Sequence, residues 1–269
     1  MRNALILCLI ALPLVVFAQN TPSKNDTLFN QTDKQGLKQG YWKGNYENGK
    51  LKYTGFFKDN KPVGTMKRYF DDGNIKAIMV YNNTSTKAYT QLFYQNGTKA
   101  AEGNYLGIAK DSVWNYYSYY EKVISNREIY TKGKKNGTSV SYFASGKISQ
   151  EIEFKNDIKD GAWRQYYENG TIKLSATYVA GKRTGDFLVN FPSGKPEWIG
   201  IYLEDKKSGK WQHFNPDGNF DTAIEFENGI AKNNEVMDKR EQQLLKEIDQ
   251  KKGSIPEPDE NSMVPGPGM

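Results

Sequence analysis

Apolar and polar side chains alternate along most of this chain with the two-residue period of a β-strand. In the segment 161–178, Trp163 lies in one alternating run and Leu174 lies in a second. Asn169 and Gly170 stand between the two runs. This pair favours a hairpin turn, because glycine tolerates a positive φ and asparagine comes close. The segment therefore predicts two antiparallel strands joined by a tight turn.

The same pattern recurs every 24 residues over most of the chain, with one slip of a single residue. Six units open with a glycine, at Gly40, Gly64, Gly137, Gly161, Gly185 and Gly209, and two others open with Ala88 and Ser112. A turn glycine follows nine residues later in seven units, at Gly49, Gly73, Gly97, Gly146, Gly170, Gly194 and Gly218. An aromatic residue closes every unit, at Phe57, Tyr81, Tyr105, Tyr130, Phe154, Tyr178, Tyr202 and Phe226. A period of this length indicates stacked copies of one supersecondary unit, so we expect about eight hairpins side by side.

Small residues stand two positions before the closing aromatic residue in several units. They are Gly55, Gly103, Ala176 and Gly200. A small residue beside a large ring leaves room for the rings of neighbouring strands to interdigitate. We therefore expect one face of the sheet to carry a packed ladder of aromatic rings that serves as the core.

A second aromatic row falls five positions after the start of most units, on the face opposite Trp163. Its members are Tyr69, Phe93, Tyr117, Tyr142, Tyr166 and Phe214. Two interpretations stay open. The rings pack on cross-strand neighbours and lysine stems, or they line a groove that accepts a partner, because a contiguous exposed aromatic row marks an interaction site.

The fourth unit departs from the pattern. It begins at Ser112, lacks the turn glycine and has one additional residue, with Glu121 and Lys122 in its turn. Its density of aromatic residues makes it the best single location for a contact. The candidate partner-binding residues are therefore Tyr69, Phe93, Trp114, Tyr116, Tyr117, Tyr119, Tyr142, Tyr166 and Phe214.

Residues 1–18 have the pattern of a cleaved signal peptide. Arg2 precedes an apolar run that is short for a bilayer span. We therefore expect the protein to be exported, to the periplasm or outside the cell, with no transmembrane segment in the mature chain. The sole cysteine, Cys8, lies within this segment, so packing alone is expected to stabilise the mature protein.

Four further parts follow in the sequence. Residues 19–39 form a polar lead-in, 40–232 contain the repeats, 233–252 have a helical pattern, and 253–269 are rich in proline and glycine, which indicates a disordered tail. The helix would cap the open end of the sheet, where backbone groups are otherwise unpaired. Binding of a partner by the helix is the alternative.

Residues that carry catalysis or hold metals are scarce. The one histidine, His213, occupies a position that Arg68, Leu92 and Gln165 fill in sister units, which is typical of a surface position. Zinc sites need clusters of cysteine or histidine, and the glycines fall at hairpin spacing rather than in a phosphate-binding loop. We therefore expect no catalytic, cofactor-binding or metal-binding residues and no enzyme activity.

The formal net charge is +6. Lysines gather near the predicted turns, as at Lys50 and Lys52 and again at Lys134 and Lys135. Solvated turns account for this pattern, and attraction to an anionic envelope surface is the alternative. Nucleic acid is not an expected partner of an exported protein.

The units resemble the MORN (membrane occupation and recognition nexus) repeat family. They are most similar to its bacterial variant, G-x-W-x-x-Y-Y-x-N-G followed by a return strand that ends in tyrosine. Residues 161–178 match nearly in full, and 40–57, 137–154 and 209–226 match well. The resemblance implies an elongated, single-layer antiparallel sheet of hairpins used for binding or scaffolding, with no shared catalytic residues. Proteins of this kind are often labelled antitoxin-like.

The sequence thus predicts an all-β, exported, non-catalytic repeat protein that acts as a protein-binding scaffold or adaptor. Two alternatives stay open: an antitoxin or immunity-like protein that neutralises a toxin, and a membrane-surface adaptor that uses its lysine-rich turns.

Overall fold

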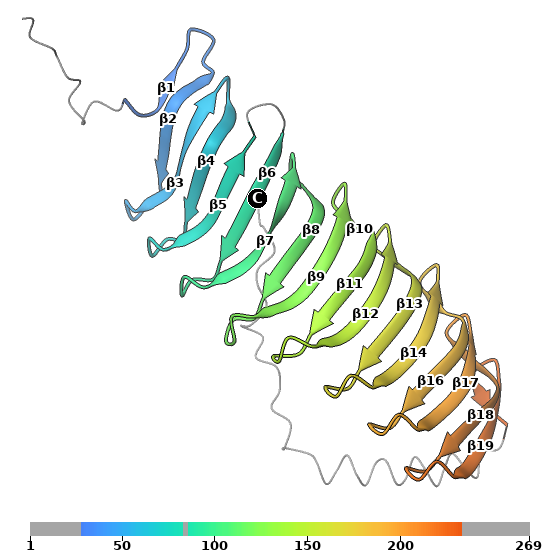
Figure 1. Ribbon diagram of the computed structural model, residues 1–269. Coiled ribbons are helices and arrows are strands. Elements are labelled where there is room, and N and C mark those ends of the chain that lie inside the picture. The colour runs from blue at the N-terminus through green and yellow to red at the C-terminus, as the bar shows by residue number, and fades with distance from the viewer. Residues whose placement is uncertain (1–27, 83–85, 233–269) are drawn as a thin grey trace, which may run out of the picture.

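A computed structural model describes residues 28–82 and 86–232. The described chain forms one open antiparallel sheet of 20 strands. The sheet is elongated and single-layered, and its hairpins follow one another from the N-terminal to the C-terminal end (Figure 1). Since the strands pair with their neighbours in sequence, each unit contacts mainly the units before and after it.

Sixteen of the described strands have six to nine residues and form eight hairpins. In chain order they are β2 (Lys38–Asn45) with β3 (Leu51–Lys58), β4 (Lys61–Tyr69) with β5 (Ile75–Tyr81), β6 (Lys87–Phe93) with β7 (Lys99–Leu106), β8 (Ala109–Tyr117) with β9 (Ile124–Thr131), β11 (Gly137–Tyr142) with β12 (Ile148–Lys155), β13 (Ile158–Tyr166) with β14 (Ile172–Val179), β16 (Gly185–Asn190) with β17 (Pro196–Leu203), and β18 (Lys206–Phe214) with β19 (Phe220–Glu227). Four strands have two residues each: β1 (Gln31–Thr32), β10 (Lys134–Lys135), β15 (Lys182–Arg183) and β20 (Ile230–Ala231).

The predicted hairpin array is confirmed, and the sequence period matches the strand register. The leading residue pairs with the closing aromatic residue, as in Gly161 with Tyr178 and Gly209 with Phe226. One boundary differs from the expectation. Strand β2 begins at Lys38 rather than Gly40, because β1 extends the pairing into the lead-in. The predicted segments 1–18, 233–252 and 253–269 lie outside the described residues.

The turn glycines adopt the left-handed conformation that their spacing predicts, with φ of 90° at Gly170. The loop is longer than a two-residue turn, however. Gly170 N–H donates to Tyr167 O at 2.9 Å, and Tyr167 N–H donates to Thr171 O at 2.9 Å. Asn169 does not adopt a positive φ. Its Oδ1 accepts from Thr171 N–H at 2.9 Å within the turn, and its Nδ2 donates to Pro192 O of the next unit at 2.9 Å. The Asn-Gly pair therefore closes one hairpin and also ties it to the next.

The additional residue of the fourth unit is absorbed in its turn. Lys122 takes a left-handed φ of 59°, and Ser118 N–H donates to Val123 O at 2.8 Å across the loop. Ser112 still pairs with Tyr130, so the strands keep the register of the other units. The insertion therefore leaves the packing of neighbouring units in place.

The core lies on one side of the sheet, which we call the aromatic face because it carries Trp114, Trp163 and Trp211. Trp114 is 0% exposed and Trp211 is 2% exposed. Their rings contact Tyr105 and Tyr202, with centroids 4.9 and 5.1 Å apart. The other side is called the opposite face. A single-layer sheet can bury tryptophan in this way because rings of neighbouring units cover one another.

Tyrosines near the hairpin turns join successive units. Tyr46 Oη donates to Tyr69 O at 2.6 Å, Tyr94 Oη donates to Tyr117 O at 3.0 Å, and Tyr167 Oη donates to Asn190 O at 2.8 Å. The same position holds phenylalanine at Phe70, Phe143 and Phe191. Those units pack a ring there without the hydroxyl that makes the bond.

Candidate functional site

A row of cations accompanies the aromatic rings, one residue for most units. Each cation stands two positions before the leading residue; the row comprises Lys38, Lys110, Lys135, Lys159, Arg183 and Lys207. Lys38 Nζ lies 4.4 Å from the Trp42 ring centroid, and Lys207 Nζ lies 4.4 Å from that of Trp211. Such cation–π contacts stabilise a fold by about 0.5–1 kcal/mol each at exposed sites. These lysines therefore cover the core, a role that their grouping near turns did not reveal.

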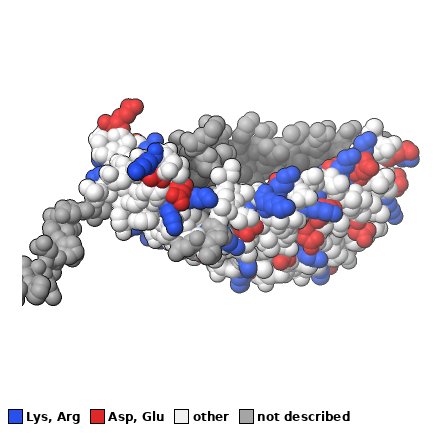
Figure 2. All heavy atoms as spheres, turned by 90° about the horizontal axis from the view of Figure 1, so that it is seen from above, with Lys and Arg blue, Asp and Glu red and all other residues white. Residues whose placement is uncertain are grey.

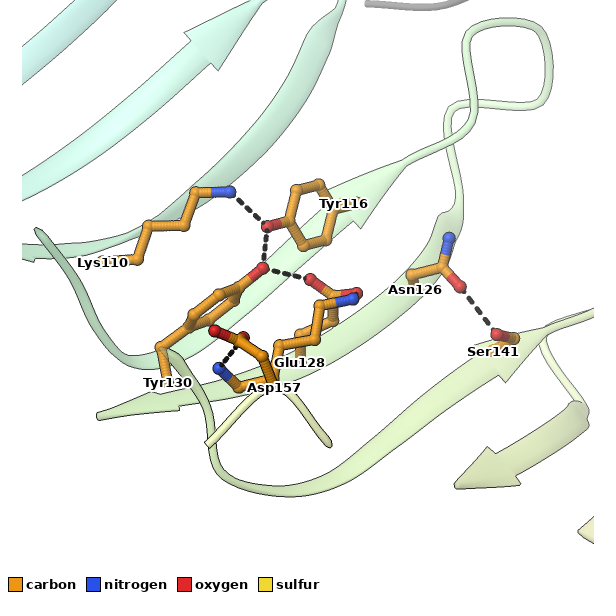
Figure 3. Close-up of polar contacts among 8 residues, drawn as sticks. Lys110, Tyr116, Asn126, Glu128, Tyr130, Ser141 and Asp157 are labelled. Atoms are coloured by element: carbon orange, nitrogen blue, oxygen red, sulfur yellow. Dashed lines mark hydrogen bonds and ion pairs between the residues drawn. The ribbon is translucent and has the colours of Figure 1, made fainter. Parts of the chain in front are cut away.

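The fourth unit contains the densest polar network among the described residues (Figure 3). Lys110 Nζ donates to Tyr116 Oη at 2.6 Å, and the Tyr116 and Tyr130 hydroxyls lie 3.1 Å apart. Tyr130 Oη donates to Glu128 Oε2 at 2.5 Å, and Lys135 forms an ion pair with Glu128. Two strands of this unit and the strand that follows thus share one chain of hydrogen bonds.

Burial sets the protonation of this network. It lowers the pKa of Lys110 and raises the pKa of Tyr116 and Tyr130, whose hydroxyl groups also contact each other or Glu128. Burial alone would raise the pKa of Glu128, but hydrogen bonds from Lys135 and Tyr130 outweigh it and the pKa falls. Glu128 is therefore ionised at neutral pH while both tyrosines stay neutral and donate hydrogen bonds.

A continuous row of polar side chains leaves this network and crosses the aromatic face. Directly opposed residues on five neighbouring strands form it; we call it the polar row: Tyr116, Asn126, Ser141, Gln150 and Gln165. Ala101 and Leu174 continue the same line at its two ends. The polar row is thus an uninterrupted polar run in the fourth, fifth and sixth units, on a line that is mostly apolar elsewhere and carries Arg68, His213 and Thr222 as the other polar residues.

The candidate residues of the second aromatic row do lie on the opposite face, and several are already engaged. Tyr117 Oη donates to Glu102 Oε1 and Tyr166 Oη donates to Glu151 Oε2, each at 2.6 Å. Phe214 packs edge-on against Phe220, with centroids 6.0 Å apart. The other members, Tyr69, Phe93 and Tyr142, are half-buried. The geometry agrees with packing on cross-strand neighbours.

The candidate residues of the fourth unit do not come together in one site. Trp114 is buried in the core and donates its Nε1–H to Asn104 O at 2.9 Å, so its ring offers no surface to a partner. Tyr116 lies in the polar network, whereas Tyr117 lies on the opposite face. Tyr119 is 44% exposed at the turn, where its ring contacts Tyr94.

Glu102 lies at the centre of a cluster on the opposite face. Burial alone would raise its pKa, but hydrogen bonds from Lys99, Tyr117 and Tyr89 outweigh burial and lower the pKa to about 2. Burial, together with the hydrogen bond to Glu102 and its negative charge, raises the pKa of Tyr117 to about 12. The carboxylate is therefore held in its charged form by three donors.

The Glu102 cluster predicts a loss of stability in acid. The folded pKa of about 2 lies below the ordinary value of 4.5. Unfolding therefore takes up a proton between these values, and the contribution of Glu102 is complete above about pH 4.5 and lost as pH falls towards 2. Urea denaturation of the Glu102→Gln variant should show a weaker pH dependence in this window than wild type. Glu168→Gln, in an exposed turn, is the control and should keep the wild-type slope; equal slopes in all three proteins would contradict the assignment.

His213 is less exposed than its variable position suggested, so the surface interpretation of this residue is wrong. Its side chain is 12% exposed, because the Trp198 ring lies 4.7 Å from it and Asp221 Oδ2 lies 2.7 Å from Nδ1. Within 28–82 and 86–232 no group of His, Cys, Asp or Glu is arranged to hold a metal ion. The same residues include no helix that is long and apolar enough to cross a membrane.

Sequence reasoning also missed an exposed apolar surface on the opposite face of the first three units. Its residues, which we call the apolar strip, are Tyr41, Phe56, Val80 and Tyr89, between 38% and 52% exposed. Tyr41 pairs with Phe56 and Val80 pairs with Tyr89, and the first two rings meet edge to face at 5.1 Å. Comparing each position between units would have found the strip, because most later units carry polar residues there, such as Thr138, Glu153 and Thr177. The seventh unit is an exception, since Ile201 holds the same position and is 48% exposed.

The comparison with protein-family models identifies the repeat. The model described as MORN repeat variant matches residues 38–59, 62–83, 135–156 and 159–180. These four segments are MORN repeat variants. They correspond to the first, second, fifth and sixth hairpins of the sheet, and each MORN match begins at or next to the start of a strand. The match thus confirms the resemblance seen in the sequence at four positions.

Other comparisons add little to the MORN assignment. No curated protein matches the chain. One solved structure that matches is titled "Crystal structure of GtfA/B complex", at 12% identity and a TM-score of 0.25. The match covers 34% of this chain and 18% of that chain, and a likeness of this size carries no argument about fold or function.

Proposed function

We propose that this MORN repeat protein is a non-catalytic scaffold that holds a protein partner on the apolar strip. The observation that carries the proposal is the exposure of four apolar or aromatic side chains in adjacent pairs across the first three units. Contiguous exposed apolar surface on a soluble domain marks an interaction site. Tyrosine and phenylalanine are also the residues enriched at the centres of protein interfaces.

The surroundings of the apolar strip have the composition of an interface rim. Lys43 and Lys67 lie on neighbouring strands of the same face, and Tyr89 Oη donates to Glu102 Oε2 at 2.8 Å at its far side. Charged groups at the edge of an apolar patch contribute to specificity and association rate more than to affinity. A protein partner with apolar side chains and acidic groups beside them fits this arrangement.

Two depressions on the described surface are open rather than enclosed, which supports holding rather than reaction. They are open hollows of about 390 and 320 Å³ near hairpin turns. Active sites usually enclose most of a ligand's surface. The pattern of residues 1–18 supports export, so the proposed scaffold acts in the periplasm or outside the cell.

Charge gives less support to a membrane-surface adaptor. Figure 2 shows Lys and Arg interspersed with Asp and Glu over the visible face, without a broad region of one sign. Binding to anionic lipid needs several basic residues gathered near the surface. An antitoxin-like role rests on the family resemblance, and it would also place a protein on the repeats.

Site-specific crosslinking tests the scaffold proposal. A photoreactive amino acid at Thr65, in the middle of the apolar strip, should trap a defined protein partner in the cells that produce the chain. The same amino acid at Thr177, in the equivalent row of the sixth unit, should trap little, because its cross-strand neighbour there is the small Ala162 and not a large apolar side chain.

Variants that copy sister units provide the second arm of this test. Phe56→Thr and Tyr89→Thr introduce the residues found at Thr177 and Thr138. The double variant should lower crosslinking from position 65 at least tenfold without changing the thermal unfolding midpoint greatly. Ile201→Thr, in the same row of a distant unit, is the control. Undiminished crosslinking in the double variant, or equal trapping at both positions, would refute the proposal.

A further inference from the structure

We propose that the polar row on the aromatic face binds a linear carbohydrate chain, independently of the protein partner on the apolar strip. In most other units, the same line of the sheet carries apolar or small residues such as Leu92, Leu174 and Val189. Between β8 and β13 it carries only hydroxyl and amide groups on five consecutive strands. The polar row therefore presents hydrogen-bonding groups on a face that elsewhere is mostly apolar.

Hydrogen bonds within the row satisfy only part of its capacity. Ser141 Oγ donates to Asn126 Oδ1 at 2.7 Å, as Figure 3 shows, and Gln165 Nε2 donates to Gln150 Oε1 at 3.1 Å. Asn126 Nδ2, Gln150 Nε2 and Gln165 Oε1 have no hydrogen-bond partner among the described residues. All these side chains are partly exposed. These two unpaired donors and one unpaired acceptor indicate a ligand that carries both hydrogen-bond acceptors and donors.

The surface beside the row is hollow and has an aromatic wall. An open depression of about 320 Å³ is lined by Ser141, Phe143, Ser149, Gln150, Gln165, Tyr166 and Lys173. Its volume is within the range of small-ligand sites. Hydroxyl groups of a sugar can donate to Gln165 Oε1 and accept from Gln150 Nε2, while the C–H face of the ring packs on Phe143. The polar row continues beyond this depression to Asn126 and Tyr116, so it offers further hydroxyl and amide groups to a chain of sugars rather than to a single one.

The arrangement favours carbohydrate over an extended peptide. The strands of the row are internal to the sheet, so their backbone groups are paired and cannot add a peptide strand. The row also presents no series of apolar pockets for alternate peptide side chains. Its five residues carry no charge, so the contacts are those of neutral hydroxyl and amide groups.

Two substitutions that copy residues of sister units remove the proposed binding groups and are expected to leave the fold intact. Asn126→Ala introduces the residue found at Ala101, and Gln165→Val introduces that found at Val189. Gln150 is kept, because it accepts the Trp163 Nε1–H bond at 3.1 Å. Both replacements restore residues that the array already accepts at this line, so the double variant should fold as wild type does.

Titration calorimetry with chitohexaose, cellohexaose and maltohexaose tests the inference on the whole chain. Wild type should bind at least one hexasaccharide, the double variant should bind it at least tenfold more weakly, and Gln212→Leu on the opposite face should bind as wild type. Absence of binding to all three sugars, unchanged binding in the double variant, or binding of an oligoglutamate peptide in their place would overturn it. Because the apolar strip lies on the other face, failure here would leave crosslinking at position 65 unaffected.

Discussion

Replacing Trp114 with alanine is expected to lower the free energy of unfolding by about 3–5 kcal/mol, which is the cost of removing a large aromatic side chain from a packed core. The ring is fully buried and contacts Tyr105 and Tyr116. Lys110 Nζ lies 4.8 Å above it, and the indole N–H donates to Asn104 O. Urea denaturation followed by far-UV circular dichroism measures the loss.

Trp42→Ala is the matched control for this experiment. Trp42 occupies the equivalent position in the first unit but is only half-buried, and its Nε1–H is shared between Gln31 O and Gln39 O. Its removal should cost less than half as much. A similar cost for both variants would mean that burial in the middle of the array does not decide stability.

Gly103→Ala and Gly200→Ala are each expected to cost about 1–3 kcal/mol, the range for overpacking a core. A Cβ at Gly103 would lie 2.6 Å from Cγ of Trp114, and one at Gly200 would lie 2.7 Å from Cγ of Trp211. Neither ring can move away easily, since Trp211 Nε1–H donates to Ile201 O at 3.1 Å, as Trp114 does to Asn104 O. Thermal unfolding by circular dichroism gives the shift.

Gly55→Ala tests whether the tryptophan is responsible. Gly55 holds the same position in its unit, but the nearest atom to its added Cβ is Cγ of Met66 at 3.1 Å. Methionine is flexible and can yield. We therefore expect Gly55→Ala to be neutral or slightly stabilising, because alanine loses less conformational freedom than glycine on folding. Equal destabilisation by all three substitutions would show that the loss of glycine from the backbone, and not the clash with a tryptophan ring, is the cause.

Much of the fold follows from the sequence because each unit is a local structure. The spacing between Gly161, Gly170 and Tyr178 predicts a hairpin, and the strand register reproduces it. The small residues at Gly103 and Gly200 predicted the close approach of rings, which the tryptophans provide. Repetition strengthens such predictions, since eight copies must satisfy one geometry at once.

The candidate contact residues were harder to predict, because exposure depends on side chains of the adjacent strands, which are close in the fold but not in the sequence. Trp114 was selected for its aromatic surroundings, yet those same rings bury it. Tyr117 and Tyr166 were selected as a row, yet carboxylates on the neighbouring strand already bind their hydroxyl groups. The cation row escaped notice because lysine near a turn is also typical of a solvated surface.

The apolar strip and the polar row emerge only when each position is compared across units rather than along the chain. In a repeat array, a residue that departs from the pattern of its unit is hard to see along the chain. The departures on the aromatic face occur at other positions of the unit than those on the opposite face. Phe56 and Gln165 are examples, since neither is unusual for a strand, but Phe56 belongs to a group of exposed apolar residues and Gln165 to an unbroken run of polar ones.

Nearest-neighbour pairing of the strands has a consequence for the distance between these two surfaces. Each added hairpin lengthens the sheet by about 10 Å, two strand spacings, and alters only the hairpins beside it. The distance between the apolar strip in the first three units and the polar row in the middle units is therefore a whole number of hairpins. Gain or loss of a single 24-residue repeat between them would change this distance by one hairpin and leave both surfaces unaltered.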